Sequence, residues 1–206
     1  MKLERIMSLA IVALAAAGTV AAEDIDAGLR AAAERVAIGT CANCHGRQGH
    51  SLAPKFPVLA GQHAGYLAAQ MQAFKAQTRG DADAIGYMWG MAAPLGDDMI
   101  AALADYYSRQ SPRAGARGAA ADIERGRGIY QSGDAAKGIP PCGACHGPNA
   151  EGSDQYPRLA GQHSQYLLKQ LRSFQSNMRN VAVMHGVAQQ LDEADMRAVA
   201  AYLQSL

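Results

Sequence analysis

The sequence has few aromatic residues and no excess of charge of either sign. Phe, Trp and Tyr together make up 6% of its 206 residues, and 19 Lys and Arg stand against 18 Asp and Glu. A chain so near neutrality lacks the basic patch that nucleic-acid binding requires. Its apolar content of 49% excludes a disordered chain. Because aromatic side chains are scarce, a core of ordinary density needs another large, flat group to fill it.

Long apolar runs are absent beyond the N-terminus. There, two basic residues precede an apolar run, Ile6–Ala17, and small residues follow up to Ala22, ahead of two acidic residues. This layout is typical of a secretory signal, so residues 1–22 are predicted to be a signal peptide cleaved after Ala22. An uncleaved membrane anchor is the alternative, since Ile6–Ala22 is nearly long enough to span a thin bilayer. The mature protein is expected in the periplasm.

The sequence repeats itself at an offset of 100 residues. Eleven of 24 positions are identical between residues 56–79 and residues 156–179. A Cys-x-x-Cys-His motif precedes each block and a Met-containing segment follows it, so the chain is a duplicated domain and is too short for a solenoid. We predict an N-terminal domain over residues 23–110 and a C-terminal domain over residues 122–206. Residues 111–121, with Pro, Gly and small side chains, are predicted to be a linker.

Helical periodicity is the regular pattern in both halves. Leu67, Met71 and Phe74 share one helix face, and their counterparts do so in the second half. Helices are expected over Ala27–Ile38, His63–Gln77, Asp97–Ser108, Ile123–Tyr130, His163–Asn177 and Asp192–Gln204. Asp192 is placed to cap the last of them. No stretch alternates with period two, so each domain is predicted to be all-α.

The four cysteines form two Cys-x-x-Cys-His motifs. Two thiols at this spacing on a helical turn can reach both vinyl groups along one side of a haem, and the His that follows can ligate the iron. Paired motifs can also bind zinc, and a single one can form a thioredoxin-like redox centre. The secretory signal and the position of each His weigh against zinc, and the βαβ surround of a thioredoxin is missing. The prediction is two covalently attached haem c groups, with thiols and proximal imidazoles from Cys41, Cys44, His45, Cys142, Cys145 and His146.

The second axial ligand of each iron is predicted from the repeat. An iron with one His can be closed by Met, closed by a second His, or left open. When the halves are aligned on the Leu before their last helices, Met88 pairs with Met184, whereas His185 and Met91 have no counterpart of their own type. We predict Met88 and Met184 as ligands, each on a Gly-containing loop. His185 and Met91 are the alternatives in the second and first halves.

The repeated block contains further shared polar residues. His63 and His163 each open a helix soon after the haem motif, so no axial role is expected of them. The other shared residues are expected to pack near the haem edge or to hydrogen-bond its propionates, with plain packing as the alternative. They are Gln62, Tyr66, Arg79, Gln162, Tyr166 and Arg179.

With these motifs the sequence resembles the dihaem class I cytochromes c of the cytochrome c4 family. The resemblance covers nearly the whole mature chain and includes the FPxLAGQ…YLxxQ block after each haem motif and the GIPPC run at 138–142. It implies two tandem cytochrome c folds packed face to face and His/Met ligation by His45 with Met88 and by His146 with Met184. One departure is Gly96, where the family usually has a Ser that caps the last helix.

The resemblance also implies a function. The implied function is to shuttle single electrons in the periplasm between a quinol-oxidising cytochrome complex and a terminal oxidase. Saturated irons leave no place for a substrate, and Met ligation raises the potential, so an electron carrier is expected rather than an enzyme. Its partners are expected to be redox proteins in transient contact, including peripheral association with membrane complexes, and neither nucleic acid nor a small-molecule substrate.

Two alternatives remain open at this point. One is the dihaem subunit of a periplasmic, flavoprotein-type dehydrogenase, because such a subunit can share the same architecture. The other is a dihaem peroxidase, which needs an open or displaceable ligand at one iron.

Overall fold

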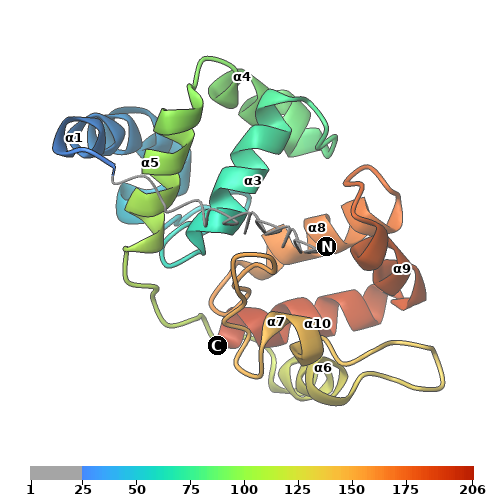
Figure 1. Ribbon diagram of the computed structural model, residues 1–206. Coiled ribbons are helices and arrows are strands. Elements are labelled where there is room, and N and C mark those ends of the chain that lie inside the picture. Colours follow the sequence, from blue (N-terminus) through green and yellow to red (C-terminus); the bar gives the residue numbers. More distant parts are fainter. Residues whose placement is uncertain (1–24) are drawn as a thin grey trace, which may run out of the picture.

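The computed structural model describes residues 25–206, and the predicted signal peptide, residues 1–22, lies outside the described residues. The described chain is helical and contains no strand, only an isolated bridge between Asp134 and Ile139. The predicted all-α class is therefore confirmed. The helices form two groups, one from each half of the sequence, that pack side by side (Figure 1).

In the first half, the haem motif continues directly from the first helix. The elements are α1 (Ala27–Val36), a π-helical turn (Ala37–Cys41), α2 (Ala42–His45), a 3₁₀ turn (Arg47–Gly49), α3 (Ala64–Lys75), a second π-helical turn (Ala84–Met88), α4 (Trp89–Ala92) and α5 (Asp97–Ser108). Ala33, Leu67, Leu103 and Tyr107 form its core, where α1, α3 and α5 meet. Buried alanines, among them Ala33, Ala102 and Ala104, let these helices approach closely.

In the second half, α6 and α10 cross at close range. The elements are α6 (Ala120–Ser132), α7 (Gly143–His146), α8 (Ser164–Gln175), α9 (Ala182–Gln190) and α10 (Glu193–Ser205). A Cβ at Gly126 of α6 would lie 2.0 Å from the carbonyl oxygen of Ala198, so only glycine fits this crossing. Met196 is 1% exposed in the core, as expected of a packing methionine.

The segment between α5 and α6 runs against the C-terminal end of α10. Residues 111–119 have no regular structure, and the backbone N–H of Ala116 donates to the carbonyl oxygen of Gln204 at 2.9 Å. A Cβ at Gly115 would lie 1.9 Å from that oxygen. The segment is therefore fixed to the second half near its end.

Met88 and Met184 do not lie on loops, and that sequence prediction was wrong. Met88 is the last residue of the second π-helical turn, and Met184 lies within α9. The predicted loops rested on Gly90 and Gly186, but neither has a positive φ. A glycine inside a helix costs only about 1 kcal/mol relative to alanine, which neighbouring helix formers can offset.

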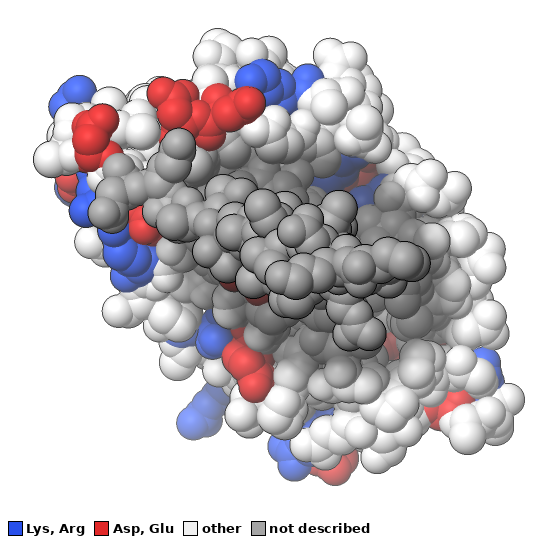
Figure 2. Space-filling model, viewed as in Figure 1, with Lys and Arg blue, Asp and Glu red and all other residues white. Residues whose placement is uncertain are grey.

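Charged side chains of both signs are interspersed on the visible face of the molecule. Figure 2 shows Lys and Arg next to Asp and Glu around its rim, with no large area of one sign. Within residues 25–206, no helix combines the length and apolar character needed to cross a bilayer.

Candidate haem sites

A cavity of about 1330 Å³ is lined by side chains from both halves. Much of its lining is apolar, with Phe74 and Leu103 on one side and Phe174 and Val199 on the other. Every residue predicted to attach or ligate a haem also lines it. These are Cys41, Cys44, His45, Met88, Cys142, Cys145, His146 and Met184.

The two motif imidazoles are buried in one fixed orientation. His45 Nδ1 lies 3.0 Å from the carbonyl oxygen of Pro57, and His146 Nδ1 lies 3.1 Å from that of Pro157. A carbonyl can only accept, so Nδ1 carries the proton and the Nε2 lone pair remains available to a metal. Burial lowers the pKa of both imidazoles below its usual value, which favours the neutral, ligating form.

The four thiols fit covalent attachment of two haems. All lie within the described residues, and none forms a disulfide. Cys41 and Cys142 are partly buried, whereas Cys44 and Cys145 are exposed. Burial raises the pKa of Cys142 to about 11 and also raises that of Cys41. With an apolar cavity, two thiols and one neutral imidazole in each half, the chain offers the donor set that haem c requires.

The alternative ligands lie differently from Met88 and Met184. His185 is not among the residues that line the cavity, and its Nδ1 lies 2.7 Å from the carbonyl oxygen of Phe174. Met91 does line the cavity but is 53% exposed. Met88 packs against Phe74.

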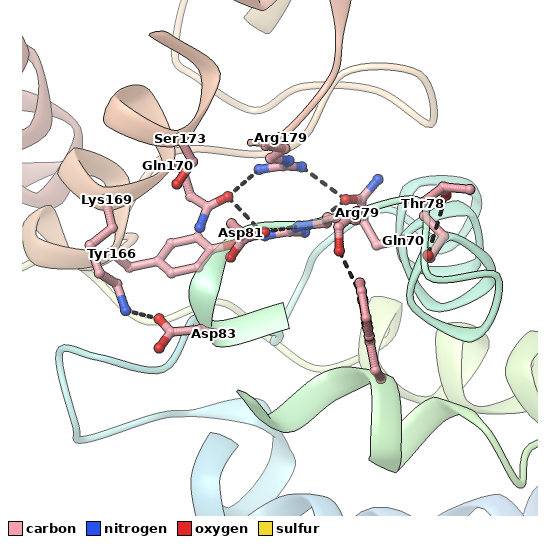
Figure 3. A network of polar contacts seen from close by, with 12 residues as sticks. Gln70, Thr78, Arg79, Asp81, Asp83, Tyr166, Lys169, Gln170, Ser173 and Arg179 are labelled. Atoms are coloured by element: carbon pink, nitrogen blue, oxygen red, sulfur yellow. Dashed lines mark hydrogen bonds and ion pairs between the residues drawn. The ribbon is translucent and has the colours of Figure 1, made fainter. Parts of the chain in front are cut away.

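The shared polar residues of the repeat form the contact between the halves. Gln70 Oε1 accepts from Arg79 at 2.8 Å and from Arg179 at 2.9 Å, and Gln170 Oε1 accepts from the same two guanidinium groups at 2.8 and 2.7 Å (Figure 3). Arg179 also donates to the hydroxyl of Tyr66 at 2.6 Å. These residues line the cavity as well. Tyr66, Arg79 and Arg179 were expected near the haem edge from the sequence, but Gln70 and Gln170 and the pairing across the halves were missed. The only signal for that pairing was the constant offset of 100 residues between the shared side chains.

His63 and His163 also reach across the contact. His63 Nε2 donates to the carbonyl oxygen of Glu151 at 2.7 Å, and His163 Nε2 donates to that of Ser51 at 3.0 Å. Neither imidazole lines the cavity. This agrees with the expectation that they have no axial role.

The polar network carries one carboxylate for two buried guanidinium groups. Asp81 accepts from Arg79 Nε at 2.7 Å, and the two side chains are 5% and 8% exposed. Position 181, at the repeat offset, is an exposed Val. Burial alone would raise the pKa of Asp81, but the charge and hydrogen bond of Arg79 outweigh it and lower that pKa overall.

The comparisons with known proteins agree with this architecture. A family model of cytochrome c matches the chain twice, over residues 30–109 and 123–206. Cytochrome c4 of Azotobacter vinelandii is 40% identical over 190 residues, which cover 85% of this chain and 89% of that protein. The structure of cytochrome c4 from Acidithiobacillus ferrooxidans matches with a TM-score of 0.77 at 39% identity, covering 81% of this chain and 98% of the other. The chain belongs to the cytochrome c4 family.

As a member of the cytochrome c4 family, the protein is a dihaem electron-transfer cytochrome. The predictions of two tandem cytochrome c folds and of two covalently bound haem c groups are confirmed. Another relative is the thiosulfate dehydrogenase electron acceptor of Thiomonas intermedia, which is 36% identical over 171 residues, or 80% of this chain and 77% of that protein. The partners of this cytochrome are therefore redox proteins.

Proposed function

We propose that this cytochrome c4 carries single electrons in the periplasm, from a quinol-oxidising cytochrome complex to a terminal oxidase. Its irons would be ligated by His45 with Met88 and by His146 with Met184. The observation that supports this most is the cavity, because each half presents one imidazole and one shared thioether to it. Two ligands from the protein at each iron leave no open position for a substrate.

The residues of the chain have distinct parts in this proposal. Bound haem supplies reversible one-electron iron chemistry. The two thiols of each motif attach the group, which prevents its loss outside the cytoplasm. The carbonyls of Pro57 and Pro157 fix the imidazole rings. The apolar lining, including Phe74 and Phe174, keeps water from the iron.

The exterior fits brief encounters with protein partners. Ile85 and Tyr87 are exposed on the π-helical turn that ends at Met88, and Met91 is exposed on α4, which follows it. Charges of both signs lie interspersed on the face seen in Figure 2. Interspersed charges suit transient redox contacts better than an obligate interface, which is larger and more apolar.

The test is an optical spectrum of the oxidised, reduced and carbon monoxide-treated protein, with two variants. Two low-spin haems with an iron–thioether band, indifferent to carbon monoxide, are expected. Met184→Ala should leave the second haem attached, lower its potential and open it to carbon monoxide. His185→Ala should neither lower the potential of the second haem nor open it to carbon monoxide. If the two variants behave the opposite way, His185 is the ligand.

The second candidate function is a dedicated haem acceptor or subunit of a periplasmic dehydrogenase. It is favoured by the similarity to the thiosulfate dehydrogenase electron acceptor of Thiomonas intermedia. Purification of the untagged protein from its native membrane and periplasm separates the two functions. A second chain that co-purifies at fixed stoichiometry would support the subunit and overturn the free carrier.

A further inference from the structure

The backbone that orients each motif imidazole is fixed by a glutamine of the opposite half. In the first half, His45 Nδ1 donates to the carbonyl oxygen of Pro57. The next residue, Val58, donates its N–H to Gln162 Oε1 at 2.8 Å, and its carbonyl accepts from Gln162 Nε2 at 3.0 Å. One carboxamide from the second half thus bonds both backbone groups of Val58, and the Val58 N–H belongs to the same peptide unit as the carbonyl that accepts from His45.

The second half has the same arrangement, and here the carboxamide comes from Gln62 of the first half. His146 donates to the carbonyl oxygen of Pro157. Arg158 donates its N–H to Gln62 Oε1 at 2.8 Å and accepts from Gln62 Nε2 at 3.0 Å. The arrangement is therefore reciprocal.

Both carboxamides are fixed on their own side as well. Gln62 Oε1 also accepts the N–H of His63 at 3.1 Å, and Gln162 Oε1 accepts that of His163 at the same distance. Each Gln side chain is 6% exposed, so water cannot replace these bonds easily. Because each carboxamide is bonded to the backbone of both halves, a shift of one half would move the backbone of the other.

We propose that Gln62 and Gln162 are positioning residues for the haem of the opposite half, Gln162 through His45 and Gln62 through His146. The inference rests on the proposed ligation of the irons by these two imidazoles. A carbonyl that accepts the Nδ1 proton raises the basicity of the ligating nitrogen. A more basic ligand stabilises the oxidised iron, so a loosened carbonyl raises the potential of the haem beside it.

The test uses crossed variants of the full haem-loaded protein. Gln162→Leu and Gln62→Leu are titrated spectroelectrochemically, and the haem methyl resonances assign each potential to its half. Gln162→Leu is expected to raise the potential of the first haem several-fold more than that of the second, and Gln62→Leu is expected to do the reverse. The Nδ1 proton of the opposite imidazole is expected to exchange faster in each variant.

The chain offers a matched control for simple weakening of the contact. His163→Ala removes another cross-half bond, to the carbonyl of Ser51, without touching Pro57 or Val58. It is expected to leave the difference between the two potentials unchanged. If Gln162→Leu does not fold, Gln162→Asn, which is shorter by one methylene, is expected to give the same crossed pattern with smaller shifts.

The outcomes separate this inference from the proposed ligation. Potentials that shift equally in both halves, or mainly in the half that carries the substitution, would overturn the cross-half role while the His/Met spectrum stays intact. Wild-type protein without that spectrum would overturn the ligation itself.

Discussion

Asp81 distinguishes the two halves at the scale of single residues. Its ion pair with Arg79 is buried, while the corresponding Val181 carries no charge. Removing one member of a buried pair leaves the other charge uncompensated, which typically costs about 3 kcal/mol or more. Asp81→Asn is therefore expected to lower the free energy of unfolding by about that amount in denaturant titrations at pH 7. Asp97→Asn, at an exposed pair with Lys75, is expected to have little effect.

The same carboxylate predicts a pH dependence. Because the folded-state pKa of Asp81 is lowered, its contribution is present above the unfolded value of about 3.9 and is lost as the pH falls through the folded value. Thermal unfolding between pH 7 and pH 3 is expected to show a smaller loss of stability in Asp81→Asn than in the wild type. Parallel curves for the two proteins would contradict this.

At this scale, the sequence predicted chemistry better than contacts. Spacing alone identified the thiols and imidazoles, since Cys-x-x-Cys-His leaves little freedom in how a haem attaches, and the repeat singled out Met88 and Met184. The partners of Gln62 and Gln162 could not be predicted. Their bonds join residues 96 and 104 positions apart, so they depend on how the two halves face each other.

At the scale of the helices, α5 and α10, the last helices of the two halves, differ in their N-terminal caps. Asp192 caps α10 in a reciprocal pair with Asp195, whereas Gly96 begins α5 with no side-chain cap. Gly96 has φ −69° and ψ 160°, which any residue can adopt. Gly96→Ser is expected to raise the free energy of unfolding by a few tenths of a kcal/mol in denaturant titrations. Gly96→Ala, which gains no hydroxyl, serves as the control, and an equal gain there would show that no cap forms.

Amphipathic helices were predicted well, and short helical turns were not. α3, α5, α8 and α10 begin and end within two residues of the predicted bounds, because their apolar residues recur on one face over three turns. The π-helical turn that ends at Met88 is five residues long, and α9, the helix that contains Met184, is nine residues long. Such short segments show no reliable period, and their glycines suggested loops instead.

On the scale of the whole molecule, the buried arginines couple the halves. Arg179 is 6% exposed and donates to Tyr66 and Gln70 of the first half. Arg179→Ala is expected to split a single calorimetric unfolding transition into two, the lower at a reduced Tm, because the halves then unfold separately. The control is Arg172→Ala on α8, the helix that precedes Arg179, since Arg172 is exposed and pairs with Glu193 within its own half. A single transition in both variants would show that other contacts provide the coupling.

The covalent connection explains how so polar a contact stays closed. Carboxamide and guanidinium hydrogen bonds give little net free energy per pair, and between separate proteins they would support only brief association. The nine residues 111–119 make the meeting of the halves intramolecular, at an effective concentration on the order of millimolar for a short connection. The halves therefore need no broad apolar interface, and the apolar side chains between them remain available to line the cavity. Proteolytic cleavage within that segment would turn a permanent contact into one that depends on protein concentration.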